Sequence, residues 1–195
     1  MTSVATPVAG ARRRIALWSA LAVAAVVAVL IAVLATSKSA GQVQQQANSP
    51  LQGKLAPEIS GAQMGVATTK LSSFRGKWVL VNFFASWCVP CQQEQGDLVR
   101  FQNHHQAAGD AVIIAVRFDD PDDGPIRQLM DKSGAHWPVV DAADAKIQWG
   151  VTGPPESFLV DPNGYVLAHI VGRVNADGLD SLLTQAKSSD VGTPR

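Results

Sequence analysis

Residues 78–91 read WVLVNFFASWCVPC and decide the fold class. The run from Trp78 to Ala85 is apolar except for Asn82, and its length and its Val and Phe content predict a strand buried on both faces. Cys88 and Cys91 follow this strand directly, where a helix is expected to begin. The stretch therefore predicts an α/β domain that carries a pair of thiols after a buried strand.

Strands and helices alternate along the rest of the chain, and Asp161-Pro162-Asn163-Gly164 is a strong hairpin turn signal. The alternation predicts a mostly parallel central sheet, and the hairpin adds antiparallel strands at its edge. We expect a mixed sheet with helices on both faces. The predicted elements after Cys91 are a helix ending near Gly109, a strand over 111–118, a helix over 126–132, strands over 137–140, 157–160 and 165–171, and a helix over 175–187.

The two cysteines are the only ones in the chain. A bridge between positions three apart closes a very short loop, so it would restrict the unfolded chain little. At a helix start, unpaired backbone N–H groups and the helix dipole favour a thiolate, so we expect the pKa of Cys88 below the ordinary value of about 8.5. Cys88 would attack a disulfide, and Cys91 would resolve the mixed disulfide. Pro90 would fix the turn between them without an extra N–H group.

Half of a zinc site is the competing interpretation of this pair. Structural zinc takes four ligands, and no further cysteine is present to complete the set. The histidines show no matching paired pattern, so we expect them to be ordinary core or surface residues: His104, His105, His136 and His169. We therefore predict a redox dithiol with no metal and no cofactor.

The N-terminal region differs from the rest of the chain. Residues 15–35 form an uncharged apolar run of about the length that spans a bilayer as a helix, and Arg12–Arg14 precede it. The positive-inside rule places such an N-terminus in the cytoplasm. A cleaved signal peptide, whose apolar region is usually shorter, and a twin-arginine export signal are alternatives that also export the domain. We predict a cytoplasmic segment 1–14, a single-pass cell-membrane anchor 15–35, a flexible tether 36–55, an extracytoplasmic domain 56–188 and a frayed tail 189–195.

The charge distribution excludes one class of partner. The formal net charge is zero, and without Arg12–Arg14 the chain is mildly acidic, so no basic footprint for nucleic acid exists. The most charged run is Asp119–Asp123. We expect it to be a solvated loop that caps the following helix, with a patch for a protein partner as the alternative.

Two segments carry a family resemblance. Residues 81–94, VNFFASWCVPCQQE, resemble the active-site region of the thioredoxin superfamily and, more closely, of the membrane-anchored TlpA, ResA and CcmG (DsbE) group. Residues 150–161, GVTGPPESFLVD, are similar to the G-V-x-G-x-P-E-[ST]-F-[LV]-[IV]-D segment of the CcmG type. The resemblance covers about residues 50–188. It implies a thioredoxin-like fold and a protein-disulfide oxidoreductase.

The resemblance also implies roles for single residues. Trp87 would shield the dithiol, and Pro155 would be a cis-proline whose loop faces the dithiol and pairs with an extended substrate backbone. Glu94 corresponds to an acidic residue near the dithiol that would raise the cysteine pKa and relay protons. A helix-surface glutamate is the alternative for Glu94. Glu156, which follows the cis-proline, would contribute to substrate choice.

Two positions depart from ordinary thioredoxins. Asn82 stands where those proteins carry a buried aspartate, and a neutral amide cannot act as a general base, which makes Glu94 the candidate substitute. Asparagine is common at this position in the TlpA-like group. Pro154 precedes the cis-proline and removes a backbone N–H group that could otherwise bind substrate.

The resemblance implies a reductase of exported proteins, with apocytochrome c and its Cys-x-x-Cys-His motif as the expected client during cytochrome c maturation. Electrons would come from a membrane thiol carrier of the CcdA or DsbD type. The motif does not set the direction of electron flow, so a disulfide-forming oxidase remains an alternative. Two others are a tethered binding domain with vestigial cysteines and a peroxiredoxin, although the chain lacks the P-x-x-x-T-x-x-C arrangement of the latter.

Overall fold

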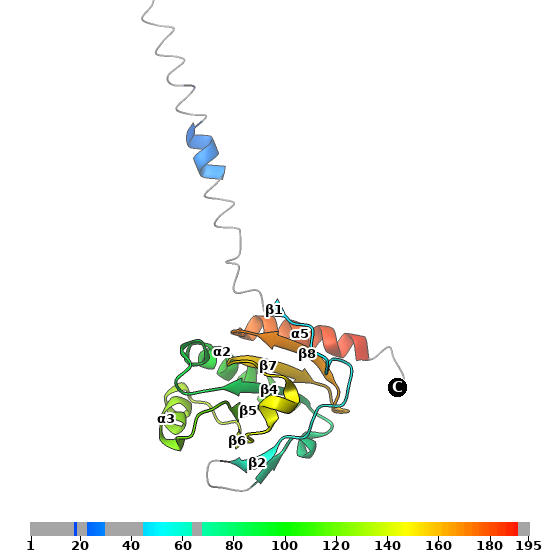
Figure 1. The fold of residues 1–195 in the computed structure, drawn as a ribbon. Coiled ribbons are helices and arrows are strands. Elements are labelled where there is room, and N and C mark those ends of the chain that lie inside the picture. Colours follow the sequence, from blue (N-terminus) through cyan, green and yellow to red (C-terminus); the bar gives the residue numbers. More distant parts are fainter. Residues whose placement is uncertain (1–17, 19–22, 30–44, 64–67, 191–195) are drawn as a thin grey trace, which may run out of the picture. The chain divides into compact units, whose positions relative to one another are not determined.

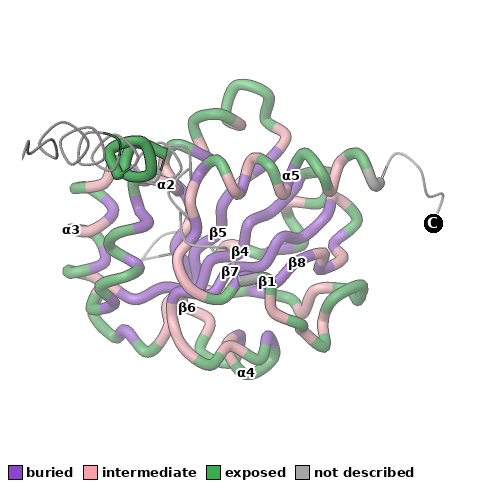
Figure 2. Tube along the Cα trace, turned by 90° about the horizontal axis from the view of Figure 1, so that it is seen from above, coloured by how far each residue is buried: buried purple, intermediate pink, exposed green. Residues whose placement is uncertain are grey.

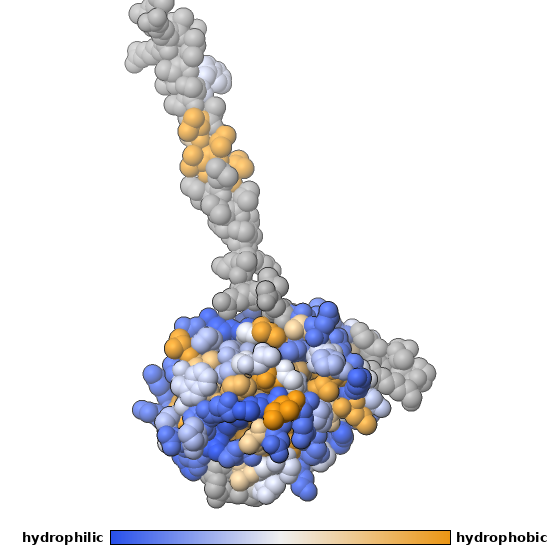
Figure 3. Space-filling view, viewed as in Figure 1, coloured by the Kyte–Doolittle hydropathy of each residue, from blue (hydrophilic) through white to orange (hydrophobic). Residues whose placement is uncertain are grey.

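The computed structural model describes residues 18, 23–29, 45–63 and 68–190, and the chain divides into two compact units, Met1–Gly41 and Gln42–Arg195. In the first unit residues 23–29 are helical and carry exposed apolar side chains (Figure 3). Within the described ranges no helix is both long and apolar enough to span a bilayer. The predicted segment 1–14 and most of the predicted anchor 15–35 lie outside the described residues.

The second unit is built on a mixed sheet whose described part has eight strands, in the order β1-β8-β7-β4-β5-β6-β2-β3 (Figure 1). The strand predicted before the cysteines, β4, lies between a parallel neighbour, β5, and an antiparallel one, β7. Strands β7 and β8 form the predicted antiparallel hairpin. The strands are β1 Gln45–Gln46, β2 Ser60–Gln63, β3 Thr68–Lys70, β4 Trp78–Phe84, β5 Ala111–Arg117, β6 Val139–Asp141, β7 Glu156–Val160 and β8 Val166–Val171.

Helices pack on both faces of the sheet, as predicted, but unequally. One face is covered by the long helices α2 (Val89–Gln106), α3 (Asp123–Ser133) and α5 (Ala176–Asp190). The other face is covered by the short helix α4 (Ala145–Trp149) and a 3-10 turn, η1 (Leu71–Phe74). The central strands between these layers are almost continuously buried (Figure 2).

The side chains of β4 alternate between the two layers, as the pleat of a strand requires. Asn82 occupies the position between Leu80 and Phe84, which both pack in the layer of α2 and α5. Val81 and Phe83 pack in the opposite layer, against Trp149 of α4. The alternation therefore turns the one polar side chain of β4 toward α2.

The predicted tether 36–55 is wrong in its second half. Gln45–Gln46 pair antiparallel with β8, and Gln52 and Leu55 form isolated bridges to Val166 and Tyr165. A polar segment can do this because the open edge of β8 offers backbone partners that require no apolar side chain. The C-terminal boundary also differs, since α5 extends to Asp190 and includes the start of the tail predicted over 189–195.

Candidate active site

Cys88 and Cys91 form a disulfide at the start of α2, with Cα atoms 5.2 Å apart. Cys88 is the N-cap residue, and its Sγ accepts a hydrogen bond from the backbone N–H of Cys91 at 3.2 Å. Pro90 lies in the first turn, as predicted. Cys88 retains 4% exposure and Cys91 has 0%. The first sulfur is therefore the one that an incoming disulfide can reach.

The loop that precedes β7 faces this disulfide. The peptide bond between Pro154 and Pro155 is cis, as predicted for Pro155. The carbonyl oxygen of Pro154 lies 3.6 Å from Cys88 Sγ. Although Pro154 offers no N–H group, its carbonyl thus forms part of the wall beside the reactive sulfur.

Glu94 is buried in α2 with 0% exposure, which rules out the alternative of a helix-surface glutamate. Its Oε1 accepts a hydrogen bond from Asn82 Nδ2 at 3.0 Å, and its Oε2 accepts one from the backbone N–H of Val174 at 3.0 Å. Burial raises the pKa of Glu94 from 4.5 to about 7, against the lowering effect of these two hydrogen bonds. Residues three apart on a helix are neighbours, so this carboxyl lies one turn beyond Cys91 on the same side of α2.

Asn82 connects Glu94 to the hairpin. Its Nδ2 also donates to Ser157 Oγ at 3.0 Å, so both amide hydrogens are used. Its Oδ1 is buried and has no hydrogen-bond partner among the described residues. Ser157 was missed by the sequence analysis, although its place two residues after the cis-proline, facing the same layer as Leu159, is a signal that could have found it.

Glu156 lies on the opposite face of the sheet and is 1% exposed. Its Oε1 accepts hydrogen bonds from Thr152 N at 2.8 Å, Thr152 Oγ1 at 3.0 Å and Gly153 N at 3.1 Å. Its Oε2 lies 2.6 Å from His169 Nε2. A carboxylate so enclosed holds its own loop and has no surface for a substrate. The predicted direct role of Glu156 in substrate choice is therefore replaced by a role in shaping the loop.

The loop after β5 supports the residues just before Cys88. Asp120, only 7% exposed, accepts a hydrogen bond from the backbone N–H of Ser86 at 2.6 Å. The carbonyl oxygen of Asp119 accepts one from Trp87 Nε1 at 3.3 Å, although the indole itself is 57% exposed. The charged run predicted as a solvated loop over Asp119–Asp123 therefore anchors the active-site loop.

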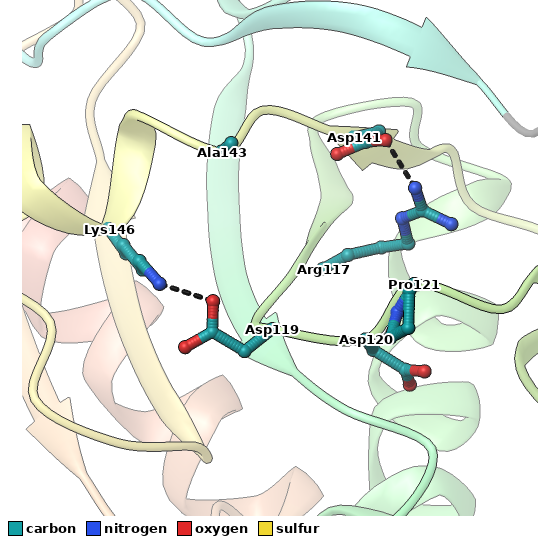
Figure 4. A pocket seen from close by; sticks show the side chains of 7 residues that line it. All are labelled: Arg117, Asp119, Asp120, Pro121, Asp141, Ala143 and Lys146. Carbon is teal, nitrogen blue, oxygen red and sulfur yellow. Dashed lines mark hydrogen bonds and ion pairs between the residues drawn. The ribbon is translucent and has the colours of Figure 1, made fainter.

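A cavity of about 370 Å³ lies beside this loop (Figure 4). Both of its cations are paired with carboxylates, Lys146 with Asp119 and Arg117 with Asp141. Neither cation is therefore left over to bind an anionic ligand. It is lined by Arg117, Asp119, Asp120, Pro121, Asp141, Ala143 and Lys146.

Comparison with known proteins agrees with this geometry. The chain matches the AhpC/TSA family over residues 52–169, which is more than half of its length. It belongs to that family. Relatives of this AhpC/TSA chain include the thiol:disulfide interchange protein HelX of Rhodobacter capsulatus, 31% identical over 157 residues that cover 74% of this chain and 85% of HelX. The thiol:disulfide interchange protein DsbE of Allochromatium vinosum is 31% identical over 66% of this chain and 71% of that protein.

The thiol-disulfide oxidoreductase ResA of Bacillus anthracis is 29% identical over 67% of this chain and 76% of its own. Among solved structures, a thiol:disulfide interchange protein of the thioredoxin family from Chlorobium tepidum superposes with a TM-score of 0.62 at 27% identity, over 72% of this chain and 99% of that one. This member of the AhpC/TSA family is therefore a protein-disulfide oxidoreductase with a thioredoxin-like fold, as the resemblance implied.

Proposed function

We propose that this oxidoreductase works outside the cytoplasm and reduces disulfides of exported proteins, with apocytochrome c during cytochrome c maturation as the expected client. The observation that carries the proposal is the pairing of a Cys88–Cys91 dithiol with a buried carboxyl, Glu94, one turn along the same helix. The names of the relatives, thiol:disulfide interchange protein and thiol-disulfide oxidoreductase, support exchange chemistry.

The reaction begins at Cys88. Its thiolate attacks a sulfur of the substrate disulfide, so that a Cys88–substrate disulfide forms and one substrate thiolate leaves. The Cys91 N–H group, which already donates to Cys88 Sγ, stabilises the negative sulfur. Cys91 then attacks Cys88, which releases the second substrate thiol and leaves the Cys88–Cys91 disulfide described above. Two electrons pass from the protein to the substrate.

Glu94 is proposed to handle the proton of Cys91. Cys91 must lose its proton before it attacks, and it has no exposure to water. A carboxyl with a pKa of about 7 can accept a proton and return it near neutral pH. Asn82 and Val174 hold this carboxyl in place through the hydrogen bonds to its two oxygens.

Glu94 also supports the direction of electron flow. A carboxylate close to the dithiol disfavours a thiolate there, and a less stable reduced form makes a dithiol a stronger reductant. We therefore propose reduction, with electrons supplied by a membrane thiol carrier of the CcdA or DsbD type. A Cys88–Cys91 reduction potential near about −270 mV is expected, and one near about −120 mV would establish the oxidase alternative.

The activity is tested with Cys88→Ser and Cys91→Ser in an insulin-reduction assay. Cys88→Ser is expected to abolish turnover, whereas Cys91→Ser should accumulate a mixed disulfide that is visible by mass spectrometry. Undiminished turnover in Cys88→Ser would support a domain with vestigial cysteines.

The location is proposed from residues 15–35, an apolar run long enough to span a bilayer. The expected result is a full-length chain in the membrane fraction, with Cys88 accessible to a membrane-impermeant thiol reagent after reduction. A shortened, soluble chain would replace the anchor by a cleaved signal peptide.

A further inference from the structure

The loop that faces Cys88 is held from behind by a buried pair, Glu156 on β7 and His169 on β8. The sheet register places His169 directly opposite Phe158, two residues after Glu156. The imidazole is stacked on the Phe158 ring, with centroids 4.1 Å apart and planes 3° from parallel. Its Nε2 lies 2.6 Å from Glu156 Oε2. The stack therefore fixes the ring in the orientation that directs Nε2 at the carboxylate.

The two carboxylate oxygens of Glu156 bind different groups. Oε1 is occupied by the loop itself, through Thr152 and Gly153. Oε2 is left for His169, which is its hydrogen-bond donor among the described residues. A buried carboxylate oxygen without a donor is costly, so the hydrogen bond from His169 helps to hold the carboxylate in this position.

The Thr152–Pro155 loop connects Glu156 to the reactive sulfur of Cys88. Thr152 and Gly153 are tied to the carboxylate, and Pro154, the next residue, places its carbonyl oxygen 3.6 Å from Cys88 Sγ. A shift of Glu156 toward another partner would therefore move the wall against which a substrate chain lies in the mixed disulfide. His169 itself lies on β8 with a side chain 9% exposed.

We propose that His169 is a positioning residue for thiol–disulfide exchange, which holds the Thr152–Pro155 loop in register with Cys88 through Glu156 and so sets the affinity for polypeptide disulfides. This replaces the expectation of an ordinary core histidine. The inference rests on the proposed function, because it requires the substrate backbone to lie along the Pro155 loop.

The test compares two amides of different length. In His169→Gln the amide nitrogen can occupy the place of Nε2, whereas in His169→Asn it is too short to reach Glu156. His169→Phe keeps a ring on Phe158 but offers no donor. Each protein is reduced and mixed with a disulfide-bonded peptide in a single-turnover assay followed by tryptophan fluorescence. Hydroxyethyl disulfide, which has no peptide backbone, serves as the second oxidant, and the reduction potential of each variant is measured.

We expect His169→Asn and His169→Phe to raise the half-saturating peptide concentration about fivefold, the scale of one hydrogen bond. The limiting rate and the rate with hydroxyethyl disulfide should change by less than about twofold, because Cys88 is not altered. The reduction potential should stay that of the native protein. His169→Gln should bind peptide nearly as the native protein does.

Equal peptide affinity in His169→Asn and His169→Gln would overturn the proposal. A parallel fall in the rate with hydroxyethyl disulfide would also overturn it, because the damage would then lie at Cys88. Failure of the proposed function has a different signature, in which the native protein reduces hydroxyethyl disulfide but no peptide.

Discussion

Glu94 and Glu156 are two buried carboxyl groups on opposite faces of one sheet, and each lies next to a part of the active site. Glu94 receives two hydrogen bonds, from Asn82 and Val174. Glu156 has four partners, three from the loop before the cis-proline and one from His169. The two groups share residue type and burial but differ in their hydrogen-bond donors. Burial raises the pKa of Glu94 to about 7, whereas Glu156 serves as the acceptor for a loop.

In the proposed mechanism the sheet separates the proton handling of Glu94 from the substrate positioning of the Thr152–Pro155 loop. The residues of β4 and β7 alternate between layers, so Asn82 and Ser157 face Glu94, whereas Glu156 and Phe158 face away from it. A change on one face should therefore leave the other largely unaffected.

The largest effect is expected from Glu156→Ala. It leaves the loop donors and His169 without their acceptor, and we expect the free energy of unfolding to fall by about 4 kcal/mol. Equilibrium urea unfolding of the disulfide form measures this loss. The control Glu156→Gln keeps one acceptor oxygen and should lose less. A loss below about 1 kcal/mol in Glu156→Ala would show that the loop does not depend on this carboxylate.

The second prediction concerns pH and Glu94. Its pKa is raised from 4.5 to about 7, so between these values the folded protein keeps a proton that the unfolded chain has released. The stability from this group is fully present below pH 4.5 and is lost as the pH rises through 7, by about 3 kcal/mol in total. Glu94→Gln should remove this dependence. The free energy of unfolding of the native protein and of Glu94→Gln is measured in urea between about pH 4 and about pH 8. The same pH dependence in both proteins would contradict the prediction.

Asn82→Leu changes only the face of the sheet that holds Glu94, and its main effect should be on the pKa of Glu94. Loss of the amide donor is expected to raise the pKa of Glu94 above 7, because the Asn82 hydrogen bond now opposes the effect of burial. The ionised form should lose about 2 kcal/mol of stability. Carbon NMR titration of the Glu94 carboxyl follows the pKa directly. An unchanged titration would mean that Asn82 does not bind the carboxylate in solution.

The smallest effects are expected from a matched pair, Ser157→Ala on one face and Thr152→Val on the other. Ser157→Ala removes the hydrogen bond that Asn82 Nδ2 donates to Ser157 Oγ, and Thr152→Val removes the one that Thr152 Oγ1 donates to the Glu156 carboxylate. Each loss should cost about 1 to 2 kcal/mol in urea unfolding. Thr152→Val should weaken peptide binding without altering the Glu94 titration. A change in the pKa of Glu94 in Thr152→Val would contradict the independence of the two faces.

Much of the fold could be predicted because its signals are local. The buried strand before Cys88, the hairpin turn at 161–164 and the helix after Cys91 are each read from a short stretch of residues. Strands β1, β2 and β3 were missed because their short polar sequences carry no apolar alternation. Strands β1 and β2 also pair with distant parts of the chain, β8 and β6. The tether boundary failed for the same reason.

The sequence by itself determined the dithiol at Cys88 and Cys91 and the strand that leads into it, since spacing and residue type suffice for both. The proline loop opposite was implied by the resemblance of residues 150–161 to the CcmG type. Only the tertiary structure decided which polar groups became buried partners. Glu94 meets Val174 across 80 positions, and Asn82 meets Ser157 across 75. Burial, and with it the pKa of Glu94 and the role of Glu156 behind its loop, depends on what distant segments bring to a side chain, and no local pattern encodes that.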